Sequence, residues 1–250
     1  MPSVTSHINA MMNVTRVDDL WKLHTEKMKT YGFDRLIYGF TRYVGSESLG
    51  DPQDWLILSS QSKEYMKRFI GDGLYYNAPM LRWALENKGA CSWRWMMEME
   101  RVENLTPSEQ KVVAFNKSMD VVAGYTISFL SVSERIRGAI ALTAKPGMTQ
   151  DEVDIVWEEH GEDIMVINNV MHLKVQTLPF IGARRLTKRQ REVLQWIGDG
   201  KTTRDVATLL GLTVATVEKH LRLAREALDV ETTAQAVVKA ALHNQMFIPD

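Results

Sequence analysis

The stretch that decides the fold reads Leu186-Thr-Lys-Arg-Gln-Arg-Glu-Val-Leu-Gln-Trp-Ile-Gly-Asp-Gly-Lys-Thr-Thr-Arg-Asp-Val-Ala-Thr-Leu-Leu-Gly-Leu-Thr-Val-Ala-Thr-Val-Glu-Lys-His-Leu221. One side of a helix carries Val206, Ala207 and Leu210, and Gly211 ends that helix. After this turn, Thr213 is placed to cap a second helix whose apolar residues recur at spacings of three and four. They are Val214, Val217, Leu221, Ala224 and Leu228. Two short amphipathic helices joined through a glycine turn predict a helix-turn-helix.

The helices on either side begin with capping-box patterns. Thr187 is followed by Gln190, and Thr232 by Gln235, and each pair satisfies the exposed amides of a first helical turn. A compact unit of about four helices is therefore predicted. From residue 184 onward the chain carries eleven Lys or Arg and eight Asp or Glu, a formal +3, against −4 for the rest. This sign suits a partner rich in phosphate.

The second helix presents a polar face suited to DNA. Counting 100° per residue places Ala215, Lys219 and Arg222 opposite its apolar side, and Lys219 and Arg222 are the best candidate contacts. Residues 201–203 open the preceding helix, where amides and hydroxyls hold a phosphate or simply cap the helix. His220 either touches a phosphate or packs inside the domain. The candidate DNA-binding residues are Lys201, Thr202, Thr203, Thr213, Ala215, Thr216, Lys219, His220 and Arg222.

The stretch carries a longer pattern than a helix-turn-helix requires: Leu186-Thr, Arg191-Glu-Val-Leu, Gly200-Lys-Thr, Val206-Ala, Leu210-Gly, Thr216-Val, His220-Leu and Gln235-Ala-Val. It closely resembles the C-terminal DNA-binding domain of the LuxR family of bacterial transcription regulators. The resemblance covers residues 186–245 and implies a tetrahelical domain that binds double-stranded DNA as a homodimer. The chain departs from the family at Leu223, Ala227 and Thr232-Thr233, where the family often has Asn, Lys and Asn-Arg. These departures concern backbone contacts and dimer packing rather than the fold.

Composition sets limits on the remainder of the chain. Its 250 residues, 45% of them hydrophobic, are enough for about two domains, and a formal charge of −1 argues against a general polyanion binder. The N-terminus has no basic segment followed by an apolar stretch, and no run approaches the roughly 18 apolar residues that span a bilayer. We therefore expect a cytoplasmic protein without a membrane partner. The single cysteine, Cys91, excludes an internal disulfide.

The strand-like and helical patterns of residues 1–175 predict a mixed α/β domain. We expect this domain to sense a signal and to set the geometry of the protein's dimer. Strand-like stretches rich in β-branched and aromatic residues lie at 35–44, 55–60, 121–131 and 135–144. Helical patterns lie at 62–70, 79–88, 107–118 and 150–175. The simplest arrangement is an α/β/α sandwich with a central antiparallel sheet, so the whole chain is α+β with a C-terminal all-α tetrahelical domain. Pro179 and Gly182 mark a linker at 176–185, before the DNA-binding domain at 186–250.

Catalysis finds no support in the sequence. There is no nucleophile elbow, zinc-protease helix, P-loop or Rossmann fingerprint, and the histidine spacing matches no metal site. We therefore expect neither an enzyme nor a resident cofactor or metal. Pro79 and Trp93 lie fourteen apart, Gly124 begins a strand, and Thr143 lies five residues beyond Gly138. This pattern resembles the autoinducer-binding domain of the LuxR family and implies a pocket for an acyl-homoserine lactone.

Three positions depart from that family's ligand contacts. Tyr65 and Phe69 stand where the family has a Trp and a Tyr that donate to the lactone and acyl carbonyls, and Ala78 stands where it has an Asp that accepts from the amide. Phe69 cannot donate and Ala78 cannot accept. An unpaired buried group costs about 1–3 kcal/mol, so losing two weakens binding by roughly two to four orders of magnitude. Tyr65 keeps a donor, and Asn77 replaces the acid if the backbone shifts by one residue.

Three interpretations of the sensory domain remain open. The pocket takes a small apolar signal other than a simple acyl-homoserine lactone, which we favour because aromatic walls with few polar groups suit such a site. In a second interpretation, the pocket still binds the acyl-homoserine lactone but through altered contacts. In a third interpretation, the aromatic side chains and the cluster Met96–Met99 fill the interior or form a surface for a partner. The protein then acts without a ligand or is controlled by another protein. The candidate ligand-binding residues are Tyr38, Trp55, Tyr65, Phe69, Asn77, Ala78, Trp93 and Thr143.

Partners and alternatives follow from these interpretations. Beyond DNA and a second copy of the chain, RNA polymerase or a regulatory protein is a further partner. A receiver-type response regulator is disfavoured, because Asp18-Asp19 follow no buried strand. A module that binds no DNA is disfavoured by the basic C-terminal unit.

Overall fold

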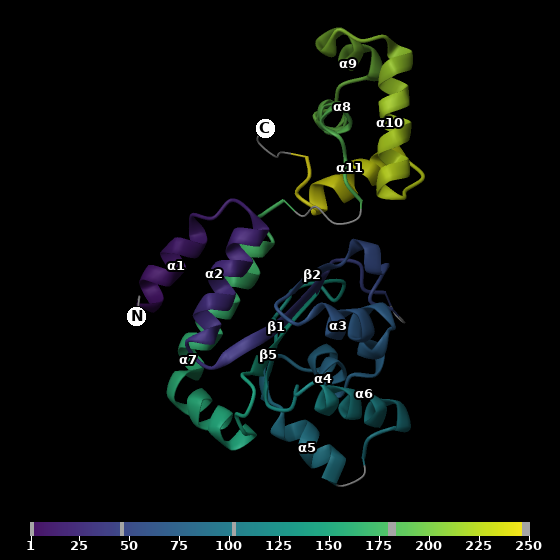
Figure 1. The fold of residues 1–250 in the computed structure, drawn as a ribbon. Coiled ribbons are helices and arrows are strands. Elements are labelled where there is room, and N and C mark those ends of the chain that lie inside the picture. The colour runs from purple at the N-terminus through teal and green to yellow at the C-terminus, as the bar shows by residue number, and fades with distance from the viewer. Residues whose placement is uncertain (1–2, 46–47, 102–103, 180–183, 247–250) are drawn as a thin grey trace. The chain divides into compact units, whose positions relative to one another are not determined.

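The computed structural model of the chain describes residues 3–45, 48–101, 104–179 and 184–246 (Figure 1). It divides into two compact units, which are described separately. Unit 1 comprises residues 1–50 and 55–176, and unit 2 comprises residues 51–54 and 177–250. Part of the predicted linker at 176–185 lies outside the described residues.

Unit 1 is built on one antiparallel sheet in the order β2-β1-β5-β4-β3. The strands are β1 (Phe33–Thr41), β2 (Leu56–Ser59), β3 (Gly89–Ser92), β4 (Gly124–Ser128) and β5 (Arg137–Ala144). The four predicted strands are all present, and β3, which pairs with β4, was not predicted. Along β5, buried and half-buried residues alternate from Arg137 to Leu142. The two faces of the sheet therefore meet different surroundings.

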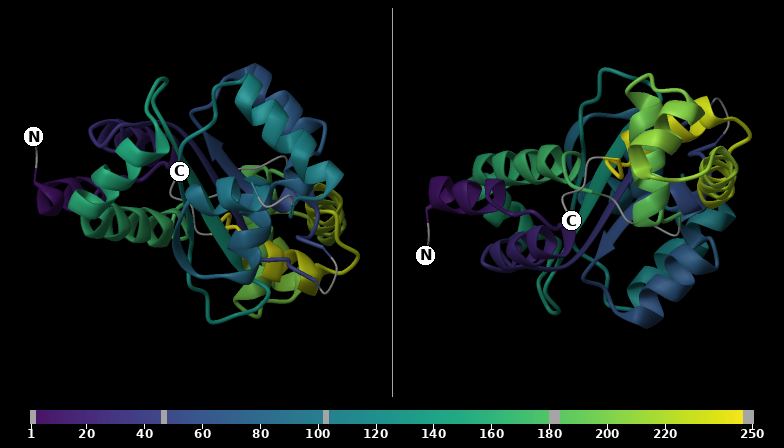
Figure 2. Two further views of the ribbon diagram at one scale, coloured as in Figure 1. Left: turned by 90° about the horizontal axis from the view of Figure 1, so that it is seen from below. Right: turned by 90° about the horizontal axis from the view of Figure 1, so that it is seen from above.

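Helices cover both faces of the sheet (Figure 2). One face carries α1 (Val4–Met12), α2 (Val17–Lys29) and α7 (Gln150–Val175). The other carries α3 (Lys63–Met66), continued by one π turn (Lys67–Gly71), a 3-10 turn (Leu74–Asn77), α4 (Pro79–Glu86), α5 (Arg94–Arg101) and α6 (Pro107–Ser118). The predicted α/β/α sandwich is confirmed. α6 and α7 have the predicted bounds because Thr106 and Thr149 each close a capping box.

The main core of unit 1 lies between the sheet and α2 and α7. Leu36 and Leu142 from the sheet, and Ile164 and Met171 from α7, have no exposed surface. Tyr38 is also fully buried, and its hydroxyl lies 2.8 Å from Nδ1 of His172. This face of the sheet is thus filled with large side chains.

Unit 2 is a four-helix arrangement with a short 3-10 turn (Pro52–Asp54). Its helices are α8 (Lys188–Gly198), α9 (Thr203–Leu210), α10 (Val214–Leu228) and α11 (Thr233–Leu242). Capping boxes open α8 at Thr187 and α11 at Thr232, as predicted. Gly211 ends α9 with φ +63°, a left-handed conformation that glycine adopts without a side-chain penalty. The predicted tetrahelical helix-turn-helix is confirmed.

One core holds the four helices of unit 2 together. Val193, Val206, Val217 and Ala236 come from α8, α9, α10 and α11 in turn and are fully buried. Trp196 packs against them and is partly buried. In the described part of the chain, no helix combines the length and the apolar composition that a bilayer crossing requires.

Candidate ligand cavity and DNA-binding helix

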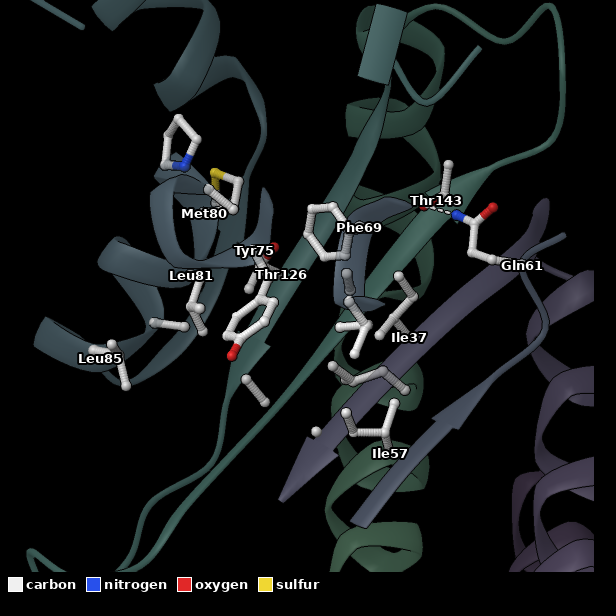
Figure 3. A pocket seen from close by; sticks show the side chains of 18 of the residues that line it. Ile37, Ile57, Gln61, Phe69, Tyr75, Met80, Leu81, Leu85, Thr126 and Thr143 are labelled. Carbon is white, nitrogen blue, oxygen red and sulfur yellow. Dashed lines mark hydrogen bonds between the residues drawn. The ribbon is translucent and has the colours of Figure 1, made fainter. Parts of the chain in front are cut away.

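A cavity of about 190 Å³ lies in unit 1, between the sheet and α4. Figure 3 shows its two walls: Met80, Leu81 and Leu85 on one side, Ile37 and Ile57 on the other. A water needs roughly 10–15 Å³ of such space. The cavity is therefore many times larger than a single water requires and has room for a small organic molecule.

Small residues of β1 and β5 leave this space open. Gly39 is paired with Ala139 across the two strands, and Ala141 follows on the same face of β5. A Cβ added at Gly39 would meet no atom within 4 Å. By contrast, a Cβ at Gly138 would lie 2.5 Å from Cε1 of His172 on the opposite face. The cavity exists because the sheet is packed tightly on one face and lined by small side chains on the other.

Aromatic side chains close the cavity, and their polar atoms are paired within the protein. The indole Nε1 of Trp93 donates to Oγ1 of Thr126 at 2.9 Å. The hydroxyl of Tyr65 donates to Oδ1 of Asn116 at 2.8 Å, and burial raises the pKa of this phenol. All four residues line the cavity. The donors of Tyr65 and Trp93 are therefore already engaged.

A looser polar pair lies near Phe69, where Figure 3 shows the amide of Gln61 next to Thr143. Nε2 of Gln61 lies 3.4 Å from Oγ1 of Thr143, at the long limit of a hydrogen bond. Thr143 is buried, whereas Gln61 is half-buried. These two groups remain available to a ligand more readily than Tyr65 or Trp93.

The structure brings most of the sequence-predicted ligand residues together. Those that line the cavity are Trp55, Tyr65, Phe69, Ala78, Trp93 and Thr143. Two predictions were wrong. Tyr38 lies on the opposite face of β1, against His172, because successive side chains of a strand alternate and Ile37 and Gly39 face the cavity. Asn77 is exposed at the end of a 3-10 turn and does not line the cavity.

Sequence reasoning missed several lining residues. Gln61, Tyr75, Asn116 and Thr126 were not predicted. Tyr75 packs edge-on against Trp55, with ring centroids 5.4 Å apart. The alternation along β1 and β5 shows which of their residues share a face of the sheet, and this was the available signal for the strand residues that line the cavity. No local signal pointed to Asn116.

The methionine cluster is divided between interior and surface. Met96 is buried and lines the cavity, whereas Met97 and Met99 are half-buried. Tyr65 stacks on Phe69 at 5.1 Å and on Phe115 at 5.2 Å. Aromatic side chains therefore occupy part of the interior, yet the space of about 190 Å³ remains.

In unit 2, α10 has the two faces that its sequence predicted, except that Val214, on the predicted apolar face, is 45% exposed at the start of the helix. Val217 and Leu221 are buried, whereas Ala215, Lys219 and Arg222 are exposed. Arg222 pairs with Glu226 one turn later, with 2.5 Å between Nη1 and Oε1. Both side chains are more than half exposed, so the pair contributes little to stability.

The residues around the first turn of α10 have structural roles. The side chain of Thr213 accepts from the amide of Thr216, and their hydroxyl oxygens lie 2.9 Å apart. His220 is half-buried and Leu221 next to it is buried. The packing role weighed for His220 is compatible with this position.

The start of α9 is already capped. The side chain of Thr202 accepts from the amide of Asp205, and the carboxylate of Asp205 accepts from the amide and hydroxyl of Thr202. The hydrogen bonds from Thr202 hold the pKa of Asp205 below its usual value. Lys201 is exposed and Thr203 is half-buried. The capping role weighed for this segment is therefore the one observed.

Comparison with known proteins agrees with both units. The autoinducer binding domain matches residues 16–175, and the domain described as bacterial regulatory proteins, luxR family, matches residues 184–240. The chain belongs to the LuxR family of transcription regulators that carry an autoinducer-binding domain. Both resemblances expected from the sequence are confirmed.

Individual relatives are distant. The transcriptional activator protein AnoR of Acinetobacter nosocomialis is 21% identical over 238 residues, which cover 94% of this chain and 95% of AnoR. The quorum sensing-dependent regulator RpaR of Rhodopseudomonas palustris is 42% identical over 60 residues, 24% of this chain and 25% of RpaR. The N-acylhomoserine lactone-dependent factor CepR2 of Burkholderia cenocepacia superimposes with a TM-score of 0.52 at 12% identity, covering 68% of this chain and 92% of CepR2. This last likeness shows the fold alone.

Proposed function

We propose that the protein is a sequence-specific, homodimeric regulator of transcription that acts in the cytoplasm and responds to a small apolar molecule other than a simple acyl-homoserine lactone. Residues 1–175 form the sensory and dimerisation domain, 176–185 the linker and 186–250 the DNA-binding domain. Dimerisation sets the spacing of two recognition helices, which match half-sites about one helical turn apart. A ligand acts by its differential affinity for the competent arrangement.

The face of α10 that holds Lys219 and Arg222 supports the DNA-binding part of the proposal. Both side chains are exposed, and the opposite face of the helix is committed to the core of unit 2. This geometry leaves the cationic face free to enter a major groove, with base contacts from Arg222 and phosphate contacts from Lys219. The capped start of α9 contributes Lys201 to the phosphate backbone.

Fluorescence anisotropy on an operator selected from genomic fragments tests this part. Arg222→Ala is expected to weaken binding by about 1–3 kcal/mol and to relax sequence preference, and Lys219→Ala to weaken binding and reduce its salt dependence. Arg189→Ala is the matched control, because Arg189 forms a similar exposed ion pair with Glu192 on α8. Unchanged affinity in both α10 variants would remove this helix from the groove.

The chemistry of three positions supports a signal other than a lactone. The hydroxyl of Tyr65 already donates to Asn116, Phe69 has no donor, and Ala78 has no acceptor. Asn77 is exposed and outside the lining, so it does not replace the missing acid. A lactone amide and two carbonyls would therefore be buried without the partners that the family supplies, which is the single observation on which the ligand class depends.

Restoring the family's groups tests the ligand class. Ala78 is the N-cap of α4 and makes no capping hydrogen bond, so an Asp fits the backbone there. The double variant Phe69→Tyr with Ala78→Asp is expected to bind octanoyl-homoserine lactone roughly two to four orders of magnitude more tightly than the natural chain, by isothermal titration. Asn77→Asp is the control, because it adds an acid next to the cavity but outside it. Tight binding by the natural chain would contradict the proposal.

Two alternatives keep specific support. The loose pair of Gln61 and Thr143, whose polar atoms lie 3.4 Å apart, favours a lactone held by altered contacts. The stacking of Tyr65 on Phe69 and Phe115 favours a self-filled domain controlled by a partner such as RNA polymerase or a regulatory protein. We prefer the apolar signal because the open space above Gly39 is unfilled by these aromatics.

A further inference from the structure

The cavity has different chemistry at its two ends. Arg137, Ala139, Ala141 and Thr143 lie at alternate positions of β5 and line the same cavity. Because a strand rises about 3.4 Å per residue, Arg137 and Thr143 begin about 20 Å apart along the floor. Ala139 and Ala141 between them are too small to obstruct a ligand. An elongated molecule on this floor would have a guanidinium at one end and a hydroxyl at the other.

Arg137 is the only charged side chain among the described residues that line the cavity, and none of these residues is a carboxylate. Its Nη1 donates to the carbonyl of Ile136 at 3.0 Å. A guanidinium has five N–H donors, so most of them remain for another partner. Arg137 is also half-buried, and a charge removed from water needs a partner more than an exposed one does.

The remaining polar groups of the lining offer little to a cation. The oxygens of Thr126 and Asn116 accept hydrogen bonds from Trp93 and Tyr65. The described lining residues include no acid that would neutralise a positive ligand, and Arg137 would repel it. An anionic or strongly accepting group is the chemistry that this lining favours.

We infer that the cavity takes an apolar carboxylic acid, whose carboxylate pairs with the guanidinium of Arg137 and whose hydrocarbon part lies over Ala139 and Ala141 toward Ile37. This inference deepens the proposed function and rests on it. Arg binds a carboxylate through two parallel N–H bonds, which fixes both position and orientation. The volume of about 190 Å³ limits the ligand to a small organic molecule. An alkyl acid and an aryl-alkyl acid share this chemistry.

Isothermal titration of the full-length chain with two acids and their neutral esters tests the inference. Decanoate and 4-phenylbutanoate represent the alkyl and aryl-alkyl sources, and their methyl esters keep the hydrocarbon part without the charge. We expect at least one acid to bind about 10- to 100-fold more tightly than its ester. The acid that binds more tightly identifies the source.

Two variants separate the carboxylate contact from general hydrophobic binding. Arg137→Gln is expected to abolish the preference for acid over ester by weakening acid binding, with a much smaller effect on the binding of the esters. Arg135→Gln, at an exposed arginine of the same segment that does not line the cavity, should preserve the preference.

The outcomes that overturn the inference differ from those that overturn the proposed function. If esters bind as tightly as acids, and Arg137→Gln changes neither, the carboxylate assignment is wrong and the apolar ligand site stands. If neither acids nor esters bind, the inference fails. If, in addition, Gly39→Val does not raise the melting temperature of the ligand-free chain, the cavity is not an open ligand site and the proposed function fails as well.

Discussion

Filling the cavity from its floor should stabilise the ligand-free protein. Gly39 lies in β1, its backbone is not left-handed, and a Cβ there would meet nothing within 4 Å. Gly39→Val removes the conformational freedom of glycine in the unfolded chain, worth about 0.5–1 kcal/mol. Burial of a valine side chain adds about 1.5–3 kcal/mol when complete, and about half of that in a partly open cavity. The two contributions raise the free energy of unfolding by about 2 kcal/mol.

Thermal unfolding of the full-length chain, followed by tryptophan fluorescence, measures this effect. Six of the seven tryptophans belong to unit 1 and only Trp196 belongs to unit 2, so the signal reports mainly on the sensory unit. For a unit of this size, 1 kcal/mol moves the Tm by about 2–4 °C. We therefore expect a rise of about 4–8 °C, together with loss of any ligand-induced shift because the ligand's place is occupied.

A neighbouring glycine supplies the matched control. Gly138 is paired with Phe40 on β1, and its Cβ would lie 2.5 Å from the ring of His172. That ring is stacked on Phe129 at 4.1 Å and has no room to move. Gly138→Val should therefore lower the Tm, since overpacking costs about 1–3 kcal/mol. A similar fall in the Tm of Gly39→Val would contradict the predicted rise, because it would mean that the face of the sheet lining the cavity is already packed.

The remaining predictions concern buried polar groups in unit 1. Burial lowers the pKa of His172 to about 4 and that of His24 to about 3. Histidines in the unfolded chain take up protons near pH 6.5. The contribution of these two residues to the free energy of unfolding is therefore complete above that pH, and it is lost as the pH falls toward the folded pKa values. Urea midpoints should thus decrease between pH 7.5 and 5, His172 alone accounting for up to about 3 kcal/mol at low pH, and a flat profile would contradict this. Thr126→Val should leave the indole N–H of Trp93 without its acceptor and lower the free energy of unfolding by about 1–3 kcal/mol. Thr126→Ser keeps the hydroxyl and should recover most of that loss, whereas equal losses would show that packing, not the hydrogen bond, is responsible.

The elements that the sequence predicted well are those whose signals are local. A capping box needs only four consecutive residues. Those predicted at Thr187 and Thr232 form the expected reciprocal hydrogen bonds, and Thr106 and Thr149 form the same bonds at the starts of α6 and α7. The same holds for the turn at Gly211. These signals fix where helices begin and end without reference to the rest of the fold.

The elements that were missed depend on distant parts of the chain. β3 has only four residues and is a strand because Gly89–Ser92 pairs with Gly124–Ser128 of β4. Tyr38 was assigned to the cavity although it lies on the other face of β1, because the alternation along a strand separates its two faces but only the rest of the fold decides which face lines the cavity.

The candidate site shows the same limit. Trp93 and Phe69 were predicted from positional resemblance, but their polar surroundings were not. Asn116 reaches Tyr65 across 51 positions of sequence, and Thr126 reaches Trp93 across 33. Partners that far apart are brought together only by the tertiary fold, and no spacing in the sequence announces them.

Whether the pocket still binds a lactone can be measured by thermal melting and native mass spectrometry of the full-length protein, purified without added signal and titrated with straight-chain acyl-homoserine lactones of short to long chain. A ligand that binds the folded protein at 100 times its Kd adds about 2.7 kcal/mol of stability, an effect too large to miss. Because Phe69 and Ala78 supply neither donor nor acceptor, we predict that the melting temperature does not change with any lactone and that no lactone mass appears on the protein. A lactone that raises the melting temperature and stays bound in the mass spectrum would contradict the account.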